Sequence, residues 1–509
     1  MQANTPILVG SAQYVDREPP SPETSLSPAD MAALVARQAL DNCEAGADMT
    51  DSVDVLAVAR LFEHSVKDTV MWPNPFGNTN NMPMSVARRV GLSPQRLIYA
   101  EVGGETPQRL VNQMCEAISR GEHRVVVLTG AEALATIRNA KRAGIELDWS
   151  EEVAGDYEDL WPDLVMTNDY ERRHGITFPI QVYALFEQVK RHSLGQDLAS
   201  YRQSIGSLFE HFSRVAAENP YSQFPVARSA AEIAALSEKN FPLCEPYGKW
   251  MVAQDAVNQG AAVVLTSVGH ARDMGIDEKN WIYLLASADL DENLVSERPQ
   301  LSTSPAQGRA LHHTLDTAGV AVDEVDLIDL YSCFPIAVSS ACEHLGLPVD
   351  GTRSLTLTGG LPFFGGPGNN YSLHAIAEVV RQLRGRNDGK ALVAANGGYL
   401  SKHSVGLYGR RIDGEWSATP SVPEIRADTI EVTEVANGAG MIESYAATYA
   451  RGEPAGGYIV GRLKENDVRF LAMADSNDPA STSLLFSEDV IGREVNVSNT
   501  GPVNVFKPA

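Results

Sequence analysis

The chain has 509 residues, of which 44% are apolar and 21% are charged, and its formal net charge is −24. This length exceeds one ordinary hydrophobic core, so we expect two or three domains. The acidic balance argues against a nucleic-acid partner, because binding phosphates needs a basic surface. A small anionic ligand stays compatible with it where backbone amides and a few cations hold the ligand.

The sequence pattern predicts a cytoplasmic protein. The first residues carry no basic segment ahead of an apolar run, so no signal peptide is predicted. No stretch approaches the roughly 18 apolar residues that span a bilayer. The five cysteines form no CxxC pair, which predicts neither a disulfide framework nor a zinc site.

Taken in order, the elements begin with a short apolar strand within residues 1–15 and an amphipathic helix over 29–42. The segment "AGADMTDSVDVLAV" (45–58) then ends in a second apolar strand. The same order returns about 270 residues later, with a helix over 306–317 and "AGVAVDEVDLIDL" at 318–330. The chain is therefore predicted to contain two similar αβ halves.

A second pair of segments repeats with a similar offset. Residues 103–134 and 365–400 each have a Gly-Gly turn that opens a helix, then a polar loop, a strand and a Gly-containing turn. Alternation of strands and helices predicts a parallel or mixed sheet covered by helices in each half.

Two segments lie outside this repeat. A helix-rich insertion is expected over roughly 140–255, and its Trp149, Trp161 and Trp250 are interpreted as packing residues, with a wall over a ligand as the alternative. After a Pro-containing linker from about 412, short strands separated by Gly and Asn turns predict a small antiparallel β-barrel, OB-like, at the C-terminus.

Three motifs resemble the thiolase superfamily. "VDLIDLYSCFPIAV" (325–338) is similar to the His-Asp-Cys-Phe region of sterol-carrier-protein-type thiolases, "NQGAAVVLTS" (258–267) to the family's Asp-Gly-Ala-Ala strand, and "TGGLPFFGGPGNN" (358–370) to its Asn-Gly-Gly…Gly-His-Pro loop. With the extra tail, the chain most resembles thiolase-like protein type 1. The resemblance implies an N-terminal thiolase half at 1–275 including the insertion, a C-terminal half at 276–411, and an additional domain at 420–509.

The chain departs from that family at the reactive positions. Where the resemblance places the acyl-accepting cysteine, the sequence has Gly103, which cannot take an acyl group. Gly366 stands at the place of the activating histidine, and Ala395 or Asn396 at that of the acid–base cysteine. Tyr331 occupies the position of the oxyanion-hole Asn or His.

The glycine turns are nevertheless suited to bind a thioester. Unpaired amides and helix dipoles at Gly103-Gly104 and Gly365-Gly366 would favour a carbonyl oxygen, enolate or phosphate in a central cleft. We expect Asn369, Asn370 and His374, which follow the second turn, to contact CoA as well, although His374 could instead only solvate its helix. The alternative is that the glycines only make tight turns.

Tyr331 and His403 are the acid–base candidates. Tyr331 follows an apolar strand, where strand ends face ligand crevices, and an interface packing role is the alternative. Lys402 and His403 follow the last core strand beside the lost cysteine turn, and His403 is either an acid–base group or a surface loop residue. Cys333 lacks a matching base, and His312 and His313 lack a third ligand at metal spacing.

Three functions follow, in this order. The first is an acyl-CoA-binding protein with a thiolase (acetyl-CoA acetyltransferase-like) fold and without acyl-enzyme chemistry, acting in lipid metabolism as a carrier, sensor or partner subunit. The second is a retro-aldol carbon–carbon lyase acting on CoA thioesters through Tyr331 and His403. The third is an acyltransferase whose nucleophile has moved, with Cys333 as the least poor candidate. CoA or acyl-CoA is the expected ligand, with no tightly bound cofactor. The tail closes the cleft, binds the nucleotide end of the ligand or recruits a protein partner.

Overall fold

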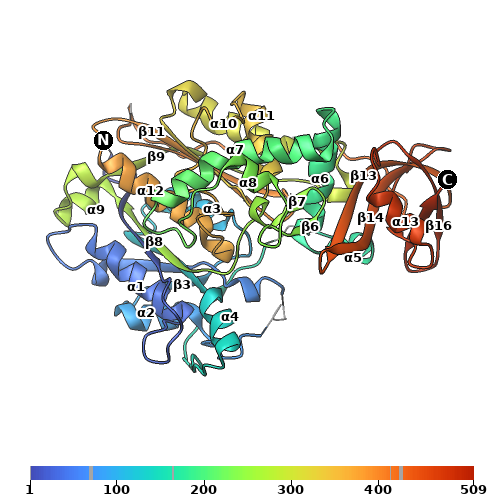
Figure 1. Ribbon diagram of the computed structural model, residues 1–509. Coiled ribbons are helices and arrows are strands. Elements are labelled where there is room, and N and C mark those ends of the chain that lie inside the picture. The colour runs from blue at the N-terminus through green and yellow to red at the C-terminus, as the bar shows by residue number, and fades with distance from the viewer. Residues whose placement is uncertain (1, 68–72, 163–164, 413, 423–427) are drawn as a thin grey trace.

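The computed structural model describes residues 2–67, 73–162, 165–412, 414–422 and 428–509. Ten strands form one mixed sheet that runs through both halves of the chain (Figure 1). Their spatial order is β10 (Leu327–Leu330), β11 (Lys390–Gly397), β12 (Lys402–Gly409), β9 (Ile282–Asp291), β1 (Pro6–Val15), β8 (Asn258–Ser267), β4 (Val125–Ala133), β2 (Val53–Val58), β3 (Arg96–Tyr99) and β5 (Glu158–Asp159).

Strand β1 is where the two halves of the sheet meet. It pairs antiparallel with β8 along its whole length and with β9 only through Ile7 and Leu8. Parallel pairs join β10 to β11 on one side of the meeting point and β2 to β3 and β4 on the other. The predicted pair of αβ halves with a mixed sheet is confirmed.

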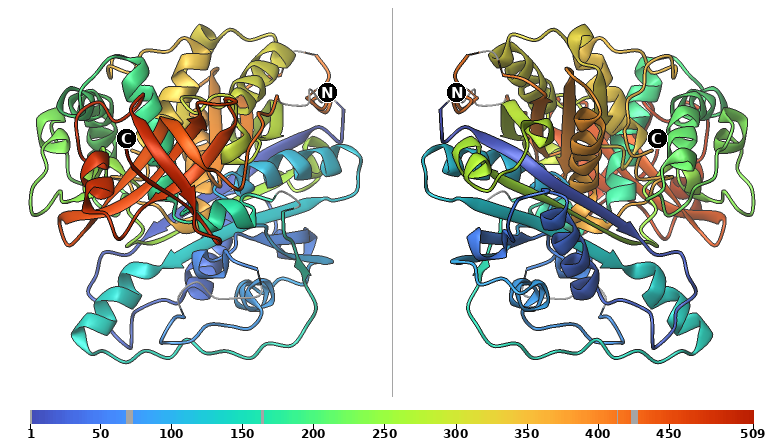
Figure 2. Two further views of the ribbon diagram at one scale, coloured as in Figure 1. Left: turned by 90° about the vertical axis from the view of Figure 1, so that its right-hand side faces the viewer. Right: turned by 90° about the vertical axis from the view of Figure 1, so that its left-hand side faces the viewer.

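Helices cover both outer faces of the sheet and fill the space between its halves (Figure 2). Helices α1 (Pro28–Asp41) and α2 (Met82–Val90) pack on the outside of the N-terminal strands. Helices α10 (Pro305–Ala318) and α11 (Pro335–Leu345) pack on the outside of the C-terminal strands.

Two further helices form the central layer. Helices α3 (Thr106–Ser119) and α12 (Tyr371–Arg384) share one apolar cluster with strands of both halves. Every residue from 371 to 380 is buried, so the first turns of α12 have no solvent-exposed face, although Ser372, His374 and Glu378 there are polar. The first three residues of α3 are buried as well, so both helices start at the centre of the molecule.

The insertion is helical, as the sequence predicts. It contains, after α4 (Leu134–Ala143), the helices α5 (Asp169–Arg173), α6 (Pro179–Ser193), α7 (Leu198–Glu218) and α8 (Ala230–Ala234), and the short strands β6 (Pro242–Cys244) and β7 (Tyr247–Gly248). Helix α9 (Val268–Asp273) follows β8.

The C-terminal segment is a small closed barrel, which confirms the prediction. Its strands are β14 (Glu453–Leu463), β15 (Arg469–Ala474), β17 (Asn504–Pro508), β16 (Glu494–Asn499) and β13 (Gly438–Ala450), and β13 closes the barrel by pairing with β14. One pairing differs from the expected antiparallel pattern: β15 and β17 are parallel. Helix α13 (Pro479–Leu485) and β16 lie between them in sequence and allow the chain to return in the same direction.

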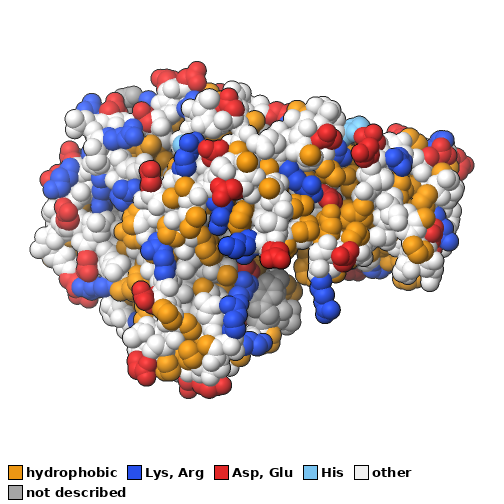
Figure 3. Space-filling view, viewed as in Figure 1, with side chains coloured by type: hydrophobic (Ala, Val, Ile, Leu, Met, Phe, Trp, Pro, Cys, Tyr) orange, Lys and Arg blue, Asp and Glu red, His pale blue; other side chains and the backbone are white. Residues whose placement is uncertain are grey.

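The barrel and the insertion share one β-sheet, although the division of the sequence into domains treats them as separate parts. Hairpin β6–β7 joins the sheet of the barrel, and the Glu245 amide donates to the Ala447 carbonyl oxygen at 2.8 Å. The Ser444 hydroxyl donates to the Leu185 carbonyl of α6 at 2.6 Å. Figure 3 shows hydrophobic side chains gathered on one face where the barrel meets the body of the molecule. Residues 242–248 therefore pair with the tail although they belong to the insertion of the N-terminal half in sequence.

Tyr458 of β14 tests this shared core. Its side chain is 1% exposed in the cluster that contains the insertion helices, and its hydroxyl has no hydrogen-bond partner. We expect Tyr458→Ala to lower the free energy of unfolding by about 3–5 kcal/mol, because a large buried ring leaves a cavity. Urea unfolding followed by tryptophan fluorescence measures the change. Tyr458→Phe is the control and should be neutral or stabilising, since it removes only an unsatisfied hydroxyl; equal losses in both variants would contradict this account.

Candidate functional site

The first glycine turn lies beside the start of α12, at the centre of the molecule. Gly103 and Gly104 precede α3, and the second turn, Gly365-Gly366, precedes α12. The Gly103 amide donates to the Asn369 side-chain oxygen at 3.0 Å, and the Ser372 hydroxyl donates to the Gly104 carbonyl oxygen. These contacts join the starts of the two helices, as the repeat predicts.

The turns offer fewer open amides than the sequence suggests. The Gly103 amide is used by Asn369, and the Gly366 amide donates to the Gln254 carbonyl oxygen at 2.8 Å. Within the part of the chain that the structure describes, the Gly104 amide has no acceptor. The expectation of open donors is therefore wrong for Gly103 and Gly366, because buried amides are satisfied inside the protein, whereas Gly104 keeps a donor.

Asn369 and Asn370 brace the loops. The Asn369 amide group donates to the Arg60 carbonyl oxygen at 2.9 Å and to the Ser65 hydroxyl at 3.1 Å. The Asn370 amide group donates to the Gly130 carbonyl oxygen at 2.7 Å. Both side chains are buried and their amide groups are used within the protein, so a contact with CoA stays a prediction for these two residues.

His374 lies in the core of the central layer. Its side chain is 0% exposed, its Nδ1 is 2.9 Å from the Gln13 side-chain oxygen, and its ring packs edge-on against Phe364. Burial lowers the pKa of His374 to about 3, so the imidazole is neutral. It neither solvates its helix nor faces an open site, because the first turns of α12 are enclosed on all sides.

Tyr331 reaches the first glycine turn. A side chain added at Gly104 would overlap the Tyr331 hydroxyl, so the phenol lies directly against this turn. The ring packs edge-on against Tyr371 at 5.2 Å, and the hydroxyl makes no hydrogen bond to any described residue. Burial raises the pKa of Tyr331 well above its ordinary value, with smaller contributions from Cys333 and Glu105. The phenol therefore stays protonated and can donate a hydrogen bond to an oxygen at the turn.

His403 does not reach this turn. It is the second residue of β12, and successive side chains of a strand point to opposite faces. Lys402 consequently points to the central layer, whereas His403 points to the outer layer, where its Nε2 is 3.0 Å from the Ser304 hydroxyl. Burial lowers the pKa of His403 to about 4. The sequence analysis places His403 in a loop, either as an acid–base group or as a surface residue, and the alternation of side chains in β12 corrects this placement.

The structure places a buried ion pair where the sequence analysis names no functional carboxylate. Glu105 and Lys402 are both 0% exposed, and the Lys402 ammonium is 2.5 Å from Glu105 Oε1. The ammonium also donates to the Val102 carbonyl oxygen at 2.8 Å and lies 3.3 Å from Glu101 Oε2. Burial raises the pKa of Glu105, against the lowering effect of Lys402 and Arg109.

The Glu105 carboxyl fills the space in front of the turns. A side chain added at Gly103 or at Gly397 would overlap Glu105 Oε2, and Gly103 has a backbone φ of +145° that side-chain-bearing residues rarely adopt. Glu105 Oε2 has no hydrogen-bond partner in the described residues. The available signal was a glutamate directly after Gly-Gly at a helix start, together with a lysine at the start of a facing strand.

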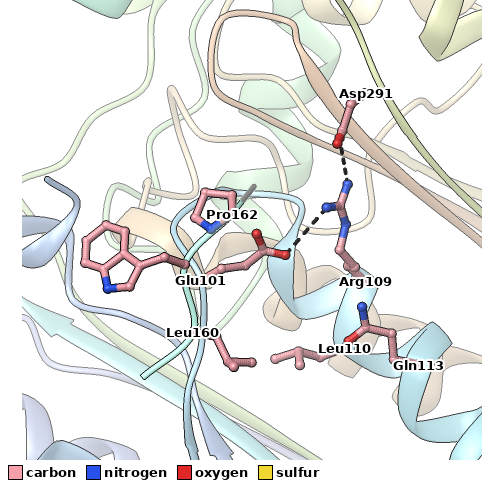
Figure 4. Close-up of a pocket in the computed structure, with 8 residues that line it drawn as sticks. Glu101, Arg109, Leu110, Gln113, Leu160, Pro162 and Asp291 are labelled. Atoms are coloured by element: carbon pink, nitrogen blue, oxygen red, sulfur yellow. Dashed lines mark hydrogen bonds and ion pairs between the residues drawn. The ribbon is translucent and has the colours of Figure 1, made fainter. Parts of the chain in front are cut away.

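A cavity of about 300 Å³ lies beside the pair (Figure 4). Glu101 and Arg109 line it together with Asp291, and Arg109 is 3.5 Å from Glu101 Oε1 and 2.9 Å from Asp291 Oδ1. Leu110, Leu160, Trp161 and Pro162 form its apolar wall. Trp161 therefore borders a cavity.

Cys333 is a poor nucleophile in this setting. Its sulfur receives a long contact of 3.6 Å from the Asn396 amide, and burial raises the pKa of Cys333 to about 12. The thiol is therefore protonated at neutral pH, and a thiolate is the reactive form. In the described ranges no cluster of three or more His, Cys, Asp or Glu has metal-binding geometry, and no helix there is long and apolar enough to cross a membrane.

Comparison with known proteins identifies the class as thiolase-like. Residues 421–502 match the family described as the thiolase-like protein type 1 additional C-terminal domain. The crystal structure of a monomeric SCP2-thiolase like protein type 1 from Mycobacterium smegmatis is 35% identical, covers 100% of both chains and superposes with a TM-score of 0.84. This chain belongs to the thiolase-like protein type 1 family.

More distant proteins share the fold. An acetyl-CoA acetyltransferase of Methanothermobacter thermautotrophicus is 23% identical over 343 residues, which is 63% of this chain and 79% of the relative. The Ltp2-ChsH2(DUF35) aldolase is 17% identical with a TM-score of 0.56, over 80% of this chain and 98% of that one. The Acat5 thiolase from Ascaris suum in complex with coenzyme A is 13% identical with a TM-score of 0.56, over 79% and 99%.

The neutral state of His374 predicts a pH dependence of stability. Because the folded pKa is about 3 and the ordinary value is 6.5, only the unfolded chain takes up the proton between these values, and stability is lost as pH falls below 6.5. Between pH 6.5 and 4.5 we expect His374→Gln to lose about 2–3 kcal/mol less than the wild type. Urea unfolding at several pH values measures the slope. His192→Gln, at an exposed position, should keep the wild-type slope, and an unchanged slope in His374→Gln would refute the assignment.

Proposed function

We propose that this chain binds acyl-CoA thioesters at the glycine turns without forming an acyl-enzyme. Family membership supports a site derived from CoA chemistry, and one of its fold neighbours is a thiolase in complex with coenzyme A. The observation that carries the proposal is the Glu105 carboxyl in front of Gly103. The position that the resemblance assigns to the nucleophile has no side chain, and the space that such a side chain needs is occupied.

The geometry of the turn supports polarisation of a thioester carbonyl. The Gly104 amide and the Tyr331 hydroxyl are donors without acceptors among the described residues, and they lie against each other. Two donors that share one acceptor oxygen stabilise an oxyanion, and this is the role that we propose for the pair. The raised pKa of Cys333 argues against the third alternative, an acyltransferase with a moved nucleophile.

The remaining expectations belong to the same proposal. We propose that the tail domain recruits a protein partner or closes the site, that the protein acts in the cytoplasm in lipid metabolism, and that its parts divide at 1–275, 276–411 and 420–509. A fold neighbour that is an aldolase described as a two-component assembly supports a protein partner.

Binding and acylation are tested together. We expect calorimetry with acetyl-CoA, propionyl-CoA and a bulky acyl-CoA to give micromolar dissociation constants, about −7 to −8 kcal/mol. Intact-mass spectrometry of the same mixtures should show no added acyl mass, because no activated nucleophile faces the turn. An absence of heat at millimolar ligand would exclude the binding function. An acyl adduct mapped to a cysteine would support the acyltransferase alternative instead.

A carbon–carbon lyase of the retro-aldol type is the second candidate. Tyr331 favours it, because a protonated phenol without a partner at an oxyanion site can donate a hydrogen bond to the thioester enolate that such a cleavage forms. The β-hydroxyl loses its proton and its oxygen forms the carbonyl of the released product as the bond between the α- and β-carbons breaks. The electron pair of that bond moves into the thioester as an enolate, and a proton then returns to the α-carbon.

The lyase reading predicts that Tyr331→Phe lowers kcat for β-hydroxyacyl-CoA cleavage by roughly 10²–10⁴-fold with little change in CoA-ester affinity. His403→Ala is the matched comparison and should retain cleavage, since His403 faces the outer layer. Release of the carbonyl product is followed by mass spectrometry. Full activity in Tyr331→Phe, or loss in His403→Ala alone, would reverse the assignment.

A further inference from the structure

Glu105 combines three features that its neighbours do not share. Its carboxyl is 0% exposed, its Oε2 has no hydrogen-bond partner among the described residues, and that oxygen faces the Cα atoms of Gly103 and Gly397. A buried polar atom without a partner costs free energy comparable to a lost hydrogen bond. Placing it at the turn where the ligand is proposed to bind gives that atom a chemical use.

The charged groups around Glu105 come from several elements. Lys402 of β12 holds Oε1 at 2.5 Å, Arg109 lies one turn along α3, and Glu101 lies before the first turn. Tyr331 faces the same turn after β10. The two cations, Lys402 and Arg109, face the carboxylates of Glu101 and Glu105, and Arg109 also faces carboxylates of β9. The surroundings of Glu105 therefore have no excess of positive or negative charge that would hold its carboxyl in one protonation state.

We propose that Glu105 is the proton-transfer residue of this site and exchanges a proton with the α-carbon of a bound CoA thioester, with Lys402 as the residue that positions it. This inference rests on the proposed function and names the base that the function lacks. The α-carbon–hydrogen bond breaks, the proton moves to Glu105 Oε2, and the electron pair moves to the thioester oxygen as an enolate. The Gly104 amide and the Tyr331 hydroxyl stabilise that oxygen. The reverse step returns the proton and restores the thioester, so no further reactant is needed.

The same contacts give the proton a route to solvent. The Lys402 ammonium contacts both Glu105 Oε1 and Glu101 Oε2, and Glu101 lines the cavity of Figure 4. A chain of donors and acceptors thus runs from the glycine turns to the cavity. A residue with a perturbed pKa beside a specific charge partner is a typical acid–base group, and burial raises the pKa of Glu105.

Deuterium exchange tests the proposal without requiring knowledge of the natural acyl chain. Purified full-length protein is incubated with acetyl-CoA, propionyl-CoA or a bulky acyl-CoA in D₂O, and deuterium at the α-carbon is measured by mass spectrometry. We expect exchange in the wild type and a loss of at least about 10²-fold in Glu105→Gln. Calorimetry on the same samples should show affinities within a few-fold of each other.

Glu187→Gln is the matched control. Glu187 is also a buried carboxyl with a pKa raised by burial, to about 7, but it accepts from the Tyr201 and Tyr247 hydroxyls at 2.5 and 2.7 Å within the insertion. Removing this charge should leave exchange unchanged. A loss of exchange equal in both variants would show a general effect of disturbing the core and would overturn the proposal.

Lys402→Met tests the positioning role through the pH profile of exchange, which would not shift if Lys402 were only structural. Because Lys402 lowers the pKa of Glu105, its removal should shift the pH at which exchange reaches half its maximum to higher values. Ligand binding without exchange in the wild type, full exchange in Glu105→Gln, or an unshifted profile in Lys402→Met would each overturn the role of Glu105 and leave the binding function standing. Absence of ligand binding would remove both the proposed function and this inference.

Discussion

The burial of two helix starts at the centre of the molecule is the constraint on which the site depends. The first amides of an α-helix have no partner within the helix and need one elsewhere. Helices α3 and α12 begin in the interior between the two halves of the sheet, where burial keeps water from bonding to these amides. The first amide of α3, that of Thr106, donates to the Gly103 carbonyl oxygen at 3.2 Å. The contacts of Gly103 with Asn369 and of Ser372 with Gly104 then join one helix start to the other.

Under the proposed function, this arrangement would let the same place lack acyl transfer and still polarise a thioester. Acyl transfer through a cysteine needs a side chain at the turn and room around it. Gly103 has no side chain, and the Glu105 carboxyl occupies the space that one would need. Stabilising a charge on a thioester oxygen needs only donors held in position, and an amide and a phenol remain there. The buried ion pair of Glu105 and Lys402 is costly to desolvate, so its position at the turns is more readily understood as chemical than as a gain in stability.

The additional C-terminal domain and the insertion pack together as one unit. Strand β6 extends the sheet of the barrel, and Tyr458 enters the apolar cluster that contains the insertion helices. The insertion therefore connects the thiolase-like core to the tail. A change of the insertion on ligand binding would reach the barrel through these shared contacts, since closely packed elements transmit displacement.

The sequence by itself determined the pair of αβ halves, the helical insertion, the small barrel and the family. The halves, the insertion and the barrel follow from local periodicity, from glycine punctuation and from segments that recur along the chain, and the family follows from the resemblance of three motifs to the thiolase superfamily. The sequence also indicated that Tyr331 follows the end of a strand, because the apolar run before it predicts that strand. The roles of Asn369, Asn370 and His374 depended on the tertiary structure, since their partners lie in other segments of the chain.

Only the tertiary structure decided which charged residues meet at the turns. Lys402 and His403 are adjacent in sequence, and the sequence placed both in a loop, where their directions are free. In the structure they begin strand β12, so one side chain enters the central layer and the other leaves it. Glu105 and Lys402 are far apart in the chain, and no local pattern records that a helix start and a strand start will face each other. The pairing arises because the halves of the sheet enclose α3, and burial then requires each charge to find its opposite.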